Sequence, residues 1–132
     1  MIYAAAHRMV ERRLPRVLIV DDQPDMARTL ARLFSGDAEV TTAASGAEAL
    51  AAIEGTDRFD LVLCDIMMPG MTGLELFDRV LAFDPGTAER FVFATGGVAP
   101  EYHAHLRATG ARCIMKPCDV EEIRKLLVPL DG

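Results

Sequence analysis

The chain has 132 residues, of which 51% are hydrophobic and 26% are charged, and its formal net charge at pH 7 is -6. This length suffices for one domain with its own core, so the fold requires neither disulfides nor a structural metal. The acidic balance disfavours direct nucleic-acid binding, which depends on clustered Lys and Arg, and no apolar run approaches the roughly 20 residues of a membrane helix.

The cysteines and the first residues indicate the compartment. Cys64, Cys113 and Cys118 are an odd number without a CxxC pair, which argues against a disulfide framework and a zinc site. We expect all three to be buried in a reducing compartment, and we expect a cytoplasmic protein. Residues 1–15 lack the pattern of a signal peptide, because their charges follow their apolar run. We interpret them as an N-terminal tail or linker remnant and assign residues 16–130 to the domain.

Two kinds of apolar stretch alternate from Arg16 onward. The short ones predict strands buried on both faces, at residues 17–20, 40–43, 61–64, 91–94 and 113–115. The others have helical spacing, with apolar faces formed by Met26, Leu30, Leu33 and Phe34, by Ala47, Leu50 and Ile53, and by Leu74, Phe77, Val80 and Leu81. A fourth helix is expected after Pro100, and a fifth through Ile123, Leu126 and Leu127.

Capping signals support these helix boundaries. Three capping boxes are predicted, formed by Ser45 with Glu48, Thr72 with Glu75, and Asp119 with Glu122. Glycines stand where helices are expected to stop, at Gly36, Gly55 and Gly110. Five strands alternating with five helices predict an α/β fold, in which a doubly wound parallel sheet is covered on both faces.

Polar residues follow the predicted strands at the edge where such sheets bind ligands. They are Asp21 and Asp22, Asp65, Thr95 and Lys116. Three carboxylates packed together repel one another unless a cation lies among them, and hard oxygen ligands suit Mg²⁺. An Asp carboxylate can act as a nucleophile that forms an acyl phosphate, and phosphoryl transfer mainly requires positioning and charge neutralisation. The cluster therefore predicts a magnesium-dependent phosphoryl site.

These segments resemble the receiver domain of two-component response regulators. The matching motifs, within a resemblance that extends from Arg16 to Leu130, are Val-Leu-Ile-Val-Asp21-Asp22, Asp65-Ile-Met-Met-Pro-Gly-Met-Thr-Gly73, Ala94-Thr-Gly-Gly97 and Lys116-Pro117. The resemblance implies a flavodoxin-like doubly wound five-stranded parallel sheet, in the order 2-1-3-4-5, with five helices. It also implies a phosphoacceptor receiver domain in a His-Asp phosphorelay.

The resemblance implies a role for each residue of the site. Asp65 matches the phosphorylated aspartate and a metal ligand, and Asp22 matches the direct Mg²⁺ ligand. Asp21 matches the carboxylate that holds the metal through water, and the backbone carbonyl of Met67 matches a further ligand.

The resemblance also implies how the site switches. Thr95 corresponds to the hydroxyl that follows the phosphoryl group, and Lys116 to the ammonium paired with that group, with the Lys116-Pro117 bond in the cis form. The expected phosphodonor is a histidine kinase or a histidine phosphotransfer protein, and the downstream protein is unknown. The domain would catalyse its own phosphorylation and dephosphorylation without being an enzyme in the ordinary sense, and a weak dimer is left open.

Several positions depart from the family pattern. Relays in this family usually carry Tyr or Phe on the fifth strand, where this chain has Cys113, Ile114 and Met115, and Cys118 stands where Phe often follows Lys-Pro. The Thr95-Gly-Gly run and the close spacing from Gly110 to Lys116 resemble receivers attached to hybrid histidine kinases. The sequence therefore leaves open whether this chain is free-standing or belongs to a hybrid kinase.

Some of these residues also occur in other kinds of protein site. An aspartate-nucleophile phosphohydrolase would carry a second Asp two residues after the nucleophile, where this chain has Met67. A pseudo-receiver that only docks onto a partner has no positive support, and Asp21 and Asp22 alone would suit a cap of the helix after Pro24. Thioethers more often fill gaps or recognition surfaces than bind soft metals, and this favours packing roles for Met67, Met68 and Met71.

Overall fold

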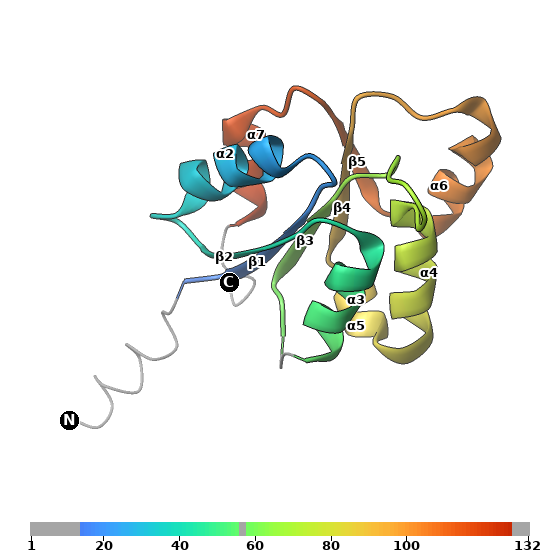
Figure 1. The fold of residues 1–132 in the computed structure, drawn as a ribbon, viewed down its shortest axis with the longest axis horizontal. Helices are drawn as coiled ribbons and strands as arrows, with labels where there is room; N and C mark the ends of the chain where they lie inside the picture. The colour runs from blue at the N-terminus through green and yellow to red at the C-terminus, as the bar shows by residue number, and fades with distance from the viewer. Residues whose placement is uncertain (1–13, 56–57, 128–132) are drawn as a thin grey trace.

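Five parallel strands form one sheet in the order β2-β1-β3-β4-β5, shown in Figure 1 for the computed structural model of the chain. The structure describes residues 14–55 and 58–127. The strands are β1 (Arg16–Val20), β2 (Glu39–Ala43), β3 (Leu61–Cys64), β4 (Phe91–Thr95) and β5 (Arg112–Met115). The predicted flavodoxin-like sheet is confirmed, and each predicted strand differs from the observed one by at most one residue at either end. Most of the predicted tail lies outside the described residues.

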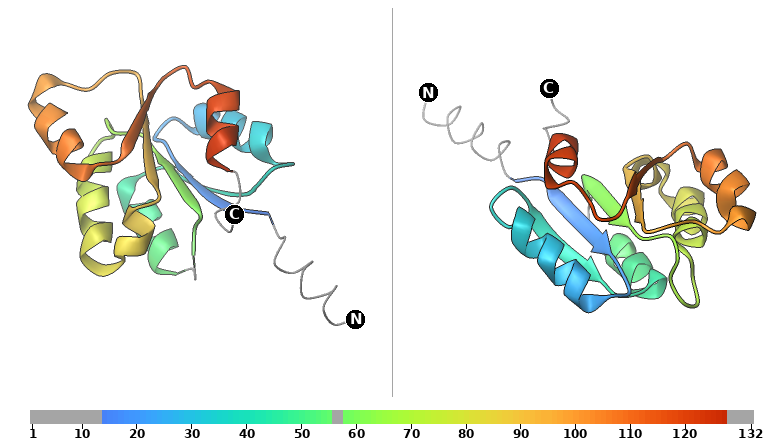
Figure 2. Two further views of the ribbon diagram at one scale, coloured as in Figure 1. Left: turned by 180° about the vertical axis from the view of Figure 1, so that it is seen from behind. Right: turned by 90° about the horizontal axis from the view of Figure 1, so that it is seen from above.

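Helices cover both faces of this sheet (Figures 1 and 2). On one face lie α2 (Pro24–Phe34) and α7 (Val120–Leu126), and on the other lie α3 (Gly46–Glu54), α4 (Gly73–Phe83) and α6 (His103–Thr109). These are the five predicted helices. The four-residue helix α5 (Pro85–Ala88) was not predicted, and a 3-10 turn (Pro100–Tyr102) leads into α6. Each described helix is too short or too polar to cross a membrane.

Alternating side chains of the central strands divide the core into two clusters. On β1, Leu18 and Val20 pack toward α3 and α4, whereas Val17 and Ile19 pack toward α2 and α7. This follows from the period of two along a strand. The strands β3 and β4 are buried over their whole length, so the carboxyl ends of the central strands are held rigidly.

The two edge strands differ from the prediction. Thr41 and Thr42 of β2 are exposed, and Met115 of β5 is 60% exposed. An edge strand has a neighbour on one side only, and the helices pack mainly over the centre of the sheet, so burial on both faces was a wrong prediction for β2 and β5. Cys64 is buried as expected, but Cys113 on β5 is exposed and Cys118 is half-buried.

Two of the three predicted capping boxes have the expected backbone bond. Ser45 Oγ accepts a hydrogen bond from the N–H of Glu48 at 3.1 Å, and Thr72 Oγ1 accepts one from the N–H of Glu75 at 3.2 Å. Asp119 instead accepts from the N–H of Glu121 at 2.9 Å, because an N-cap carboxylate can bond either the second or the third helical N–H. Gly110 ends α6 with φ 70°, a left-handed conformation that glycine adopts without strain.

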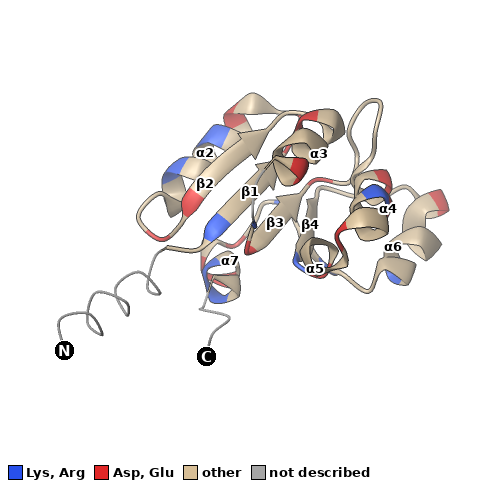
Figure 3. Cartoon of the chain, turned by 90° about the horizontal axis from the view of Figure 1, so that it is seen from below, with Lys and Arg blue, Asp and Glu red and all other residues tan. Residues whose placement is uncertain are grey.

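Charges of both signs are mixed on the helices α2 and α7 (Figure 3). On α7, Arg124 pairs with Glu121 at 2.6 Å, and it also reaches Asp37 at 3.3 Å. Such pairs among exposed side chains contribute little to stability. The mixing gives these two helices no uniformly basic surface of the kind that binds nucleic-acid phosphates.

Candidate functional site

The predicted polar residues stand at the carboxyl ends of four strands. Asp21 follows β1, Asp65 follows β3, Thr95 ends β4 and Lys116 follows β5. Backbone hydrogen bonds continue the sheet through them, since the N–H of Asp65 donates to the Val20 carbonyl at 2.9 Å and that of Lys116 donates to the Thr95 carbonyl at 2.8 Å. The parallel sheet therefore brings these residues to one edge.

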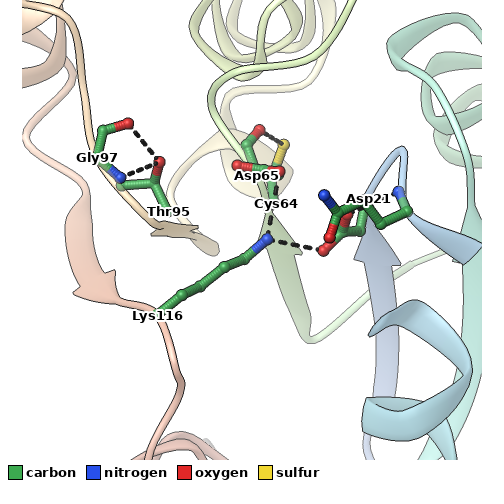
Figure 4. Close-up of polar contacts among 7 residues, drawn as sticks. Asp21, Cys64, Asp65, Thr95, Gly97 and Lys116 are labelled. Atoms are coloured by element: carbon green, nitrogen blue, oxygen red, sulfur yellow. Dashed lines mark hydrogen bonds and ion pairs between the residues drawn. The ribbon is translucent and has the colours of Figure 1, made fainter. Parts of the chain in front are cut away.

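The ammonium group of Lys116 links two of the carboxylates (Figure 4). Its Nζ donates to Asp21 Oδ2 at 2.9 Å and to Asp65 Oδ2 at 3.3 Å. In the strand order, β4 lies between β5 and β3, and both β4 and β3 lie between β5 and β1. The long lysine side chain therefore extends past one strand to reach Asp65 and past two to reach Asp21. Its side chain is only 16% exposed, so the ion pairs are screened less than pairs at the surface.

Burial and charge act together on the ionisation of these groups. Burial raises the pKa of Asp65 above its ordinary value, although the charge and hydrogen bond of Lys116 act in the opposite direction. Burial alone would lower the pKa of Lys116, but its hydrogen bond to Asp21 and the charges of both carboxylates raise that pKa above its ordinary value. Lys116 is therefore a cation at neutral pH, and its positive charge stabilises the ionised form of the two neighbouring carboxylates.

Asp22 completes an acidic cluster. One carboxylate oxygen from each of Asp21, Asp22 and Asp65 lies within 4.8 Å of the other two. The alternative in which the first two cap the next helix is wrong, because the N-cap of α2 is Gln23, without a side-chain capping bond. Asp21 Oδ1 accepts a hydrogen bond from the N–H of Gln23 at 2.9 Å. This bond holds one of its oxygens while Lys116 holds the other.

Thr95 lies at the same edge, but its hydroxyl is engaged with the following loop. Its Oγ1 donates to the Gly97 carbonyl at 2.9 Å and accepts from the Gly97 N–H at 3.3 Å (Figure 4). The side chain is 1% exposed. The described contacts thus join Asp21, Asp65 and Lys116 directly, and they join Thr95 to Gly97.

The three methionines after Asp65 have different surroundings. Met68 is buried in the core, and Met71 is half-buried and packs against that core, as expected for thioethers that fill gaps. Met67, whose carbonyl was predicted to be a metal ligand, has a residue exposure of 40%. The Lys116-Pro117 peptide bond is cis, as the resemblance implied.

Cys64 and Gly73 contact the backbone of Asp65 and were missed as site residues. The Cys64 thiol donates to the Asp65 carbonyl at 3.1 Å, and burial, with the charges of Asp65 and Asp21, raises the pKa of this thiol, so it stays protonated. A methyl group on Gly73 would lie 2.2 Å from the same carbonyl oxygen. The glycine at the start of the helix after Asp65 was the available signal for this close approach.

Comparisons with known proteins agree on the family. The family model described as "Response regulator receiver domain" matches residues 17–128. A response regulator receiver protein of Anaeromyxobacter sp. is 40% identical over 113 residues, which are 84% of this chain and 46% of that protein. A probable transcriptional regulatory protein, TcrX of Mycobacterium tuberculosis, is 32% identical over 108 residues, which are 81% of this chain and 45% of that protein. The chain thus spans less than half the length of these two relatives.

A solved structure supports the same fold. The CheY-like response regulator receiver domain protein from Methanospirillum hungatei JF-1 superposes with a TM-score of 0.77 at 32% identity. The alignment covers 86% of this chain and 90% of that one. The similarity therefore extends over nearly the whole of both chains.

Proposed function

The chain belongs to the response regulator receiver domain family, and on that premise we propose that it is a phosphoacceptor switch in which Asp65 is phosphorylated. The phosphodonor is a histidine kinase or a histidine phosphotransfer protein. The observation that carries this proposal is the contact of Lys116 with both Asp21 and Asp65, beside the three carboxylate oxygens that lie within 4.8 Å of one another. Such a cluster is suited to a metal ion and a phosphoryl group.

The donor set suits Mg²⁺. Carboxylate and carbonyl oxygens are the ligands this ion prefers, and it usually keeps several waters and takes substrate phosphate oxygens. Asp22 and Asp65 would hold it directly, Asp21 through a water molecule and Met67 through its backbone carbonyl. Bound there, Mg²⁺ would neutralise charge on the phosphoryl oxygens.

The protein's own residues would carry out the transfer. A carboxylate oxygen of Asp65 attacks phosphorus, the P–N bond of the donor phosphohistidine breaks, and the imidazole leaves with the electron pair. Lys116, already within 3.3 Å of Asp65 Oδ2, would then pair with a phosphoryl oxygen. The Thr95 hydroxyl would exchange its bonds to Gly97 for another phosphoryl oxygen, and this exchange would couple the phosphoryl group to the loop after β4.

The same residues argue against a phosphohydrolase that turns over separate substrates. Such an enzyme needs a general acid two residues after its nucleophile, and the Met67 thioether has no proton to give. The domain would catalyse only its own phosphorylation and dephosphorylation.

The output of the switch remains a prediction. The surface around α6, β5 and α7 is expected to change its preference for an unknown partner protein. Cys113, Ile114 and Met115 occupy β5, the strand on which relays of this family usually carry Tyr or Phe. A cytoplasmic location also remains a prediction. The resemblance of Thr95-Gly96-Gly97 to receivers of hybrid histidine kinases leaves both a free-standing chain and attachment to such a kinase open, and a weak dimer is open as well.

Incubation with acetyl phosphate tests the proposal. Intact-mass spectrometry should show one phosphoryl adduct that forms in the presence of Mg²⁺ and not in the presence of EDTA. An adduct that forms equally well in EDTA would contradict the metal requirement. No adduct from acetyl phosphate or from a panel of phosphorylated histidine kinases would contradict the phosphoacceptor function.

Lys116→Ala should separate metal binding from phosphoryl transfer. The carboxylate oxygens remain, so Mg²⁺ should still bind, but loss of the ammonium should slow phosphorylation roughly 100-fold. NMR of the phosphorylated variant should also lack the shifts expected at the Thr95 and Gly97 amides. The matched control is Lys125→Ala on α7, where the lysine is exposed. A wild-type phosphorylation rate in Lys116→Ala would argue against the proposed role of this residue.

A further inference from the structure

The side chain of Met71, in the loop between β3 and α4, packs closely against the start of α3. A methyl group on Gly46 would lie 2.6 Å from Sδ, 2.8 Å from Cβ and 2.9 Å from Cγ of Met71. Met71 is half-buried and packs against the core, and the right-hand view of Figure 2 shows this loop next to α3. Met71 therefore occupies the space that a side chain at position 46 would fill.

Neither side of this contact can easily give way. Gly46 is the first residue of α3, which Ser45 caps and which Ala49 and Ile53 anchor in the core. On the other side, the contact includes the Cβ of Met71, so rotation of the Met71 side chain does not remove it. Any group added at Gly46 therefore displaces the backbone of the loop.

The loop is also closed on itself. The N–H of Met71 donates to the Pro69 carbonyl at 3.0 Å, and the N–H of Gly73 donates to the Ile66 carbonyl at 2.8 Å. Gly70 between them has φ 80°, a turn conformation suited to glycine. Because Gly73, two residues after Met71, is bonded to Ile66, a displacement at Met71 should reach the backbone of Ile66, directly after Asp65, and of its neighbour Met67.

We propose that Met71, seated on Gly46, is a positioning residue that fixes the backbone of residues 65–67 for Mg²⁺. This role rests on the proposed function, in which Asp65 and the Met67 carbonyl are metal ligands. Mg²⁺ requires a nearly ideal octahedral shell, so a shift of a few tenths of an ångström in the carbonyl should cost affinity. Residues that orient metal ligands typically affect affinity by about 10-fold to 100-fold.

Mg²⁺ titrations followed by the NMR signals of the Ile66 and Gly73 amides test this role. Gly46→Ala overfills the contact and Met71→Ala empties it, and each should weaken Mg²⁺ binding roughly 10-fold while the spectrum stays dispersed. Gly36→Ala is the matched control, because a methyl group there meets nothing within 4 Å, and it should bind Mg²⁺ like the wild type.

A variant with both substitutions tests whether the contact between residues 46 and 71 causes the weaker Mg²⁺ binding. In Gly46→Ala/Met71→Ala, the clashes with Sδ and Cγ are gone and only the approach to the Cβ of residue 71 at 2.8 Å remains, so the combined loss should be smaller than the product of the two single losses. If the loss of Mg²⁺ affinity in the double variant equalled the product of the two single losses, the two residues would act independently, and the contact between them would not be the cause. Wild-type Mg²⁺ affinity in Met71→Ala would overturn the positioning role, whether or not Gly46→Ala folds, but it would not contradict the proposed metal site. A wild-type chain that binds no Mg²⁺ would overturn both.

Discussion

Asp65→Asn is expected to abolish phosphorylation by acetyl phosphate and leave the fold intact. The amide has nearly the shape of the carboxylate but lacks the nucleophilic oxygen, and Lys116 keeps its bond to Asp21 at 2.9 Å. Removing a charge that burial disfavours should not destabilise the fold strongly, since burial raises the pKa of Asp65. The measurement is the intact mass after incubation with acetyl phosphate and Mg²⁺.

Asp78→Asn provides the matched control for this substitution. Asp78 lies on α4 with 55% of its side chain exposed, and it pairs with His105 at 2.8 Å. This variant should be phosphorylated to the wild-type extent. A phosphoryl adduct on Asp65→Asn would show that another residue accepts the group.

Gly73→Ala is expected to destabilise the fold by about 3 kcal/mol or more, as overpacking does in a rigid site. Its methyl group would lie 2.2 Å from the Asp65 carbonyl oxygen and 3.1 Å from both the Asp65 carbonyl carbon and the Cys64 Sγ. Two of these atoms belong to the backbone at the end of β3, so relief requires α4 to move away from the sheet. Thermal unfolding should show a Tm lower by roughly 10 °C.

The direction of this effect is informative, because Ala usually stabilises a helix relative to Gly by about 1 kcal/mol. Gly36→Ala, where no contact arises, should change stability by less than about 0.5 kcal/mol. If Gly73→Ala unfolded at or above the wild-type temperature, α4 would not be held against Asp65 as tightly as its geometry indicates.

The central part of the fold follows from local patterns in the sequence. The strands β1, β3 and β4 are short continuous apolar runs, and such runs arise when a strand is covered on both faces. The edge strand β2 is more polar, with Thr41 and Thr42, but Cys113 and Met115 of β5 are as apolar as core residues. Their exposure depends on strand order, which a single run does not contain. The short helix α5 did have a signal in the sequence, because Asp84 followed by Pro85 is a typical N-cap and first helical residue. In the structure Asp84 accepts a hydrogen bond from the N–H of Thr87 at 3.2 Å.

The candidate site was predictable to the extent that it depends on strand ends. Asp65 and Lys116 are far apart in sequence, yet the parallel sheet brings them to one edge, where they meet. The bond from Thr95 to Gly97 reflects a choice between side-chain rotamers, which residue types do not determine. The contacts of Gly46 with Met71 and of Gly73 with Asp65 depend on the absence of a Cβ, and spacing alone does not reveal which glycines need that space.

Locating the phosphoryl group tests the central claim most directly. Borohydride reduction of an acyl phosphate converts the aspartate into homoserine, which tandem mass spectrometry assigns to a position. After incubation with acetyl phosphate and Mg²⁺, homoserine is predicted at position 65. Homoserine at position 21 or 22, or a phosphoryl group that resists reduction on a hydroxyl or imidazole side chain, would contradict the assignment of Asp65 as the phosphoacceptor.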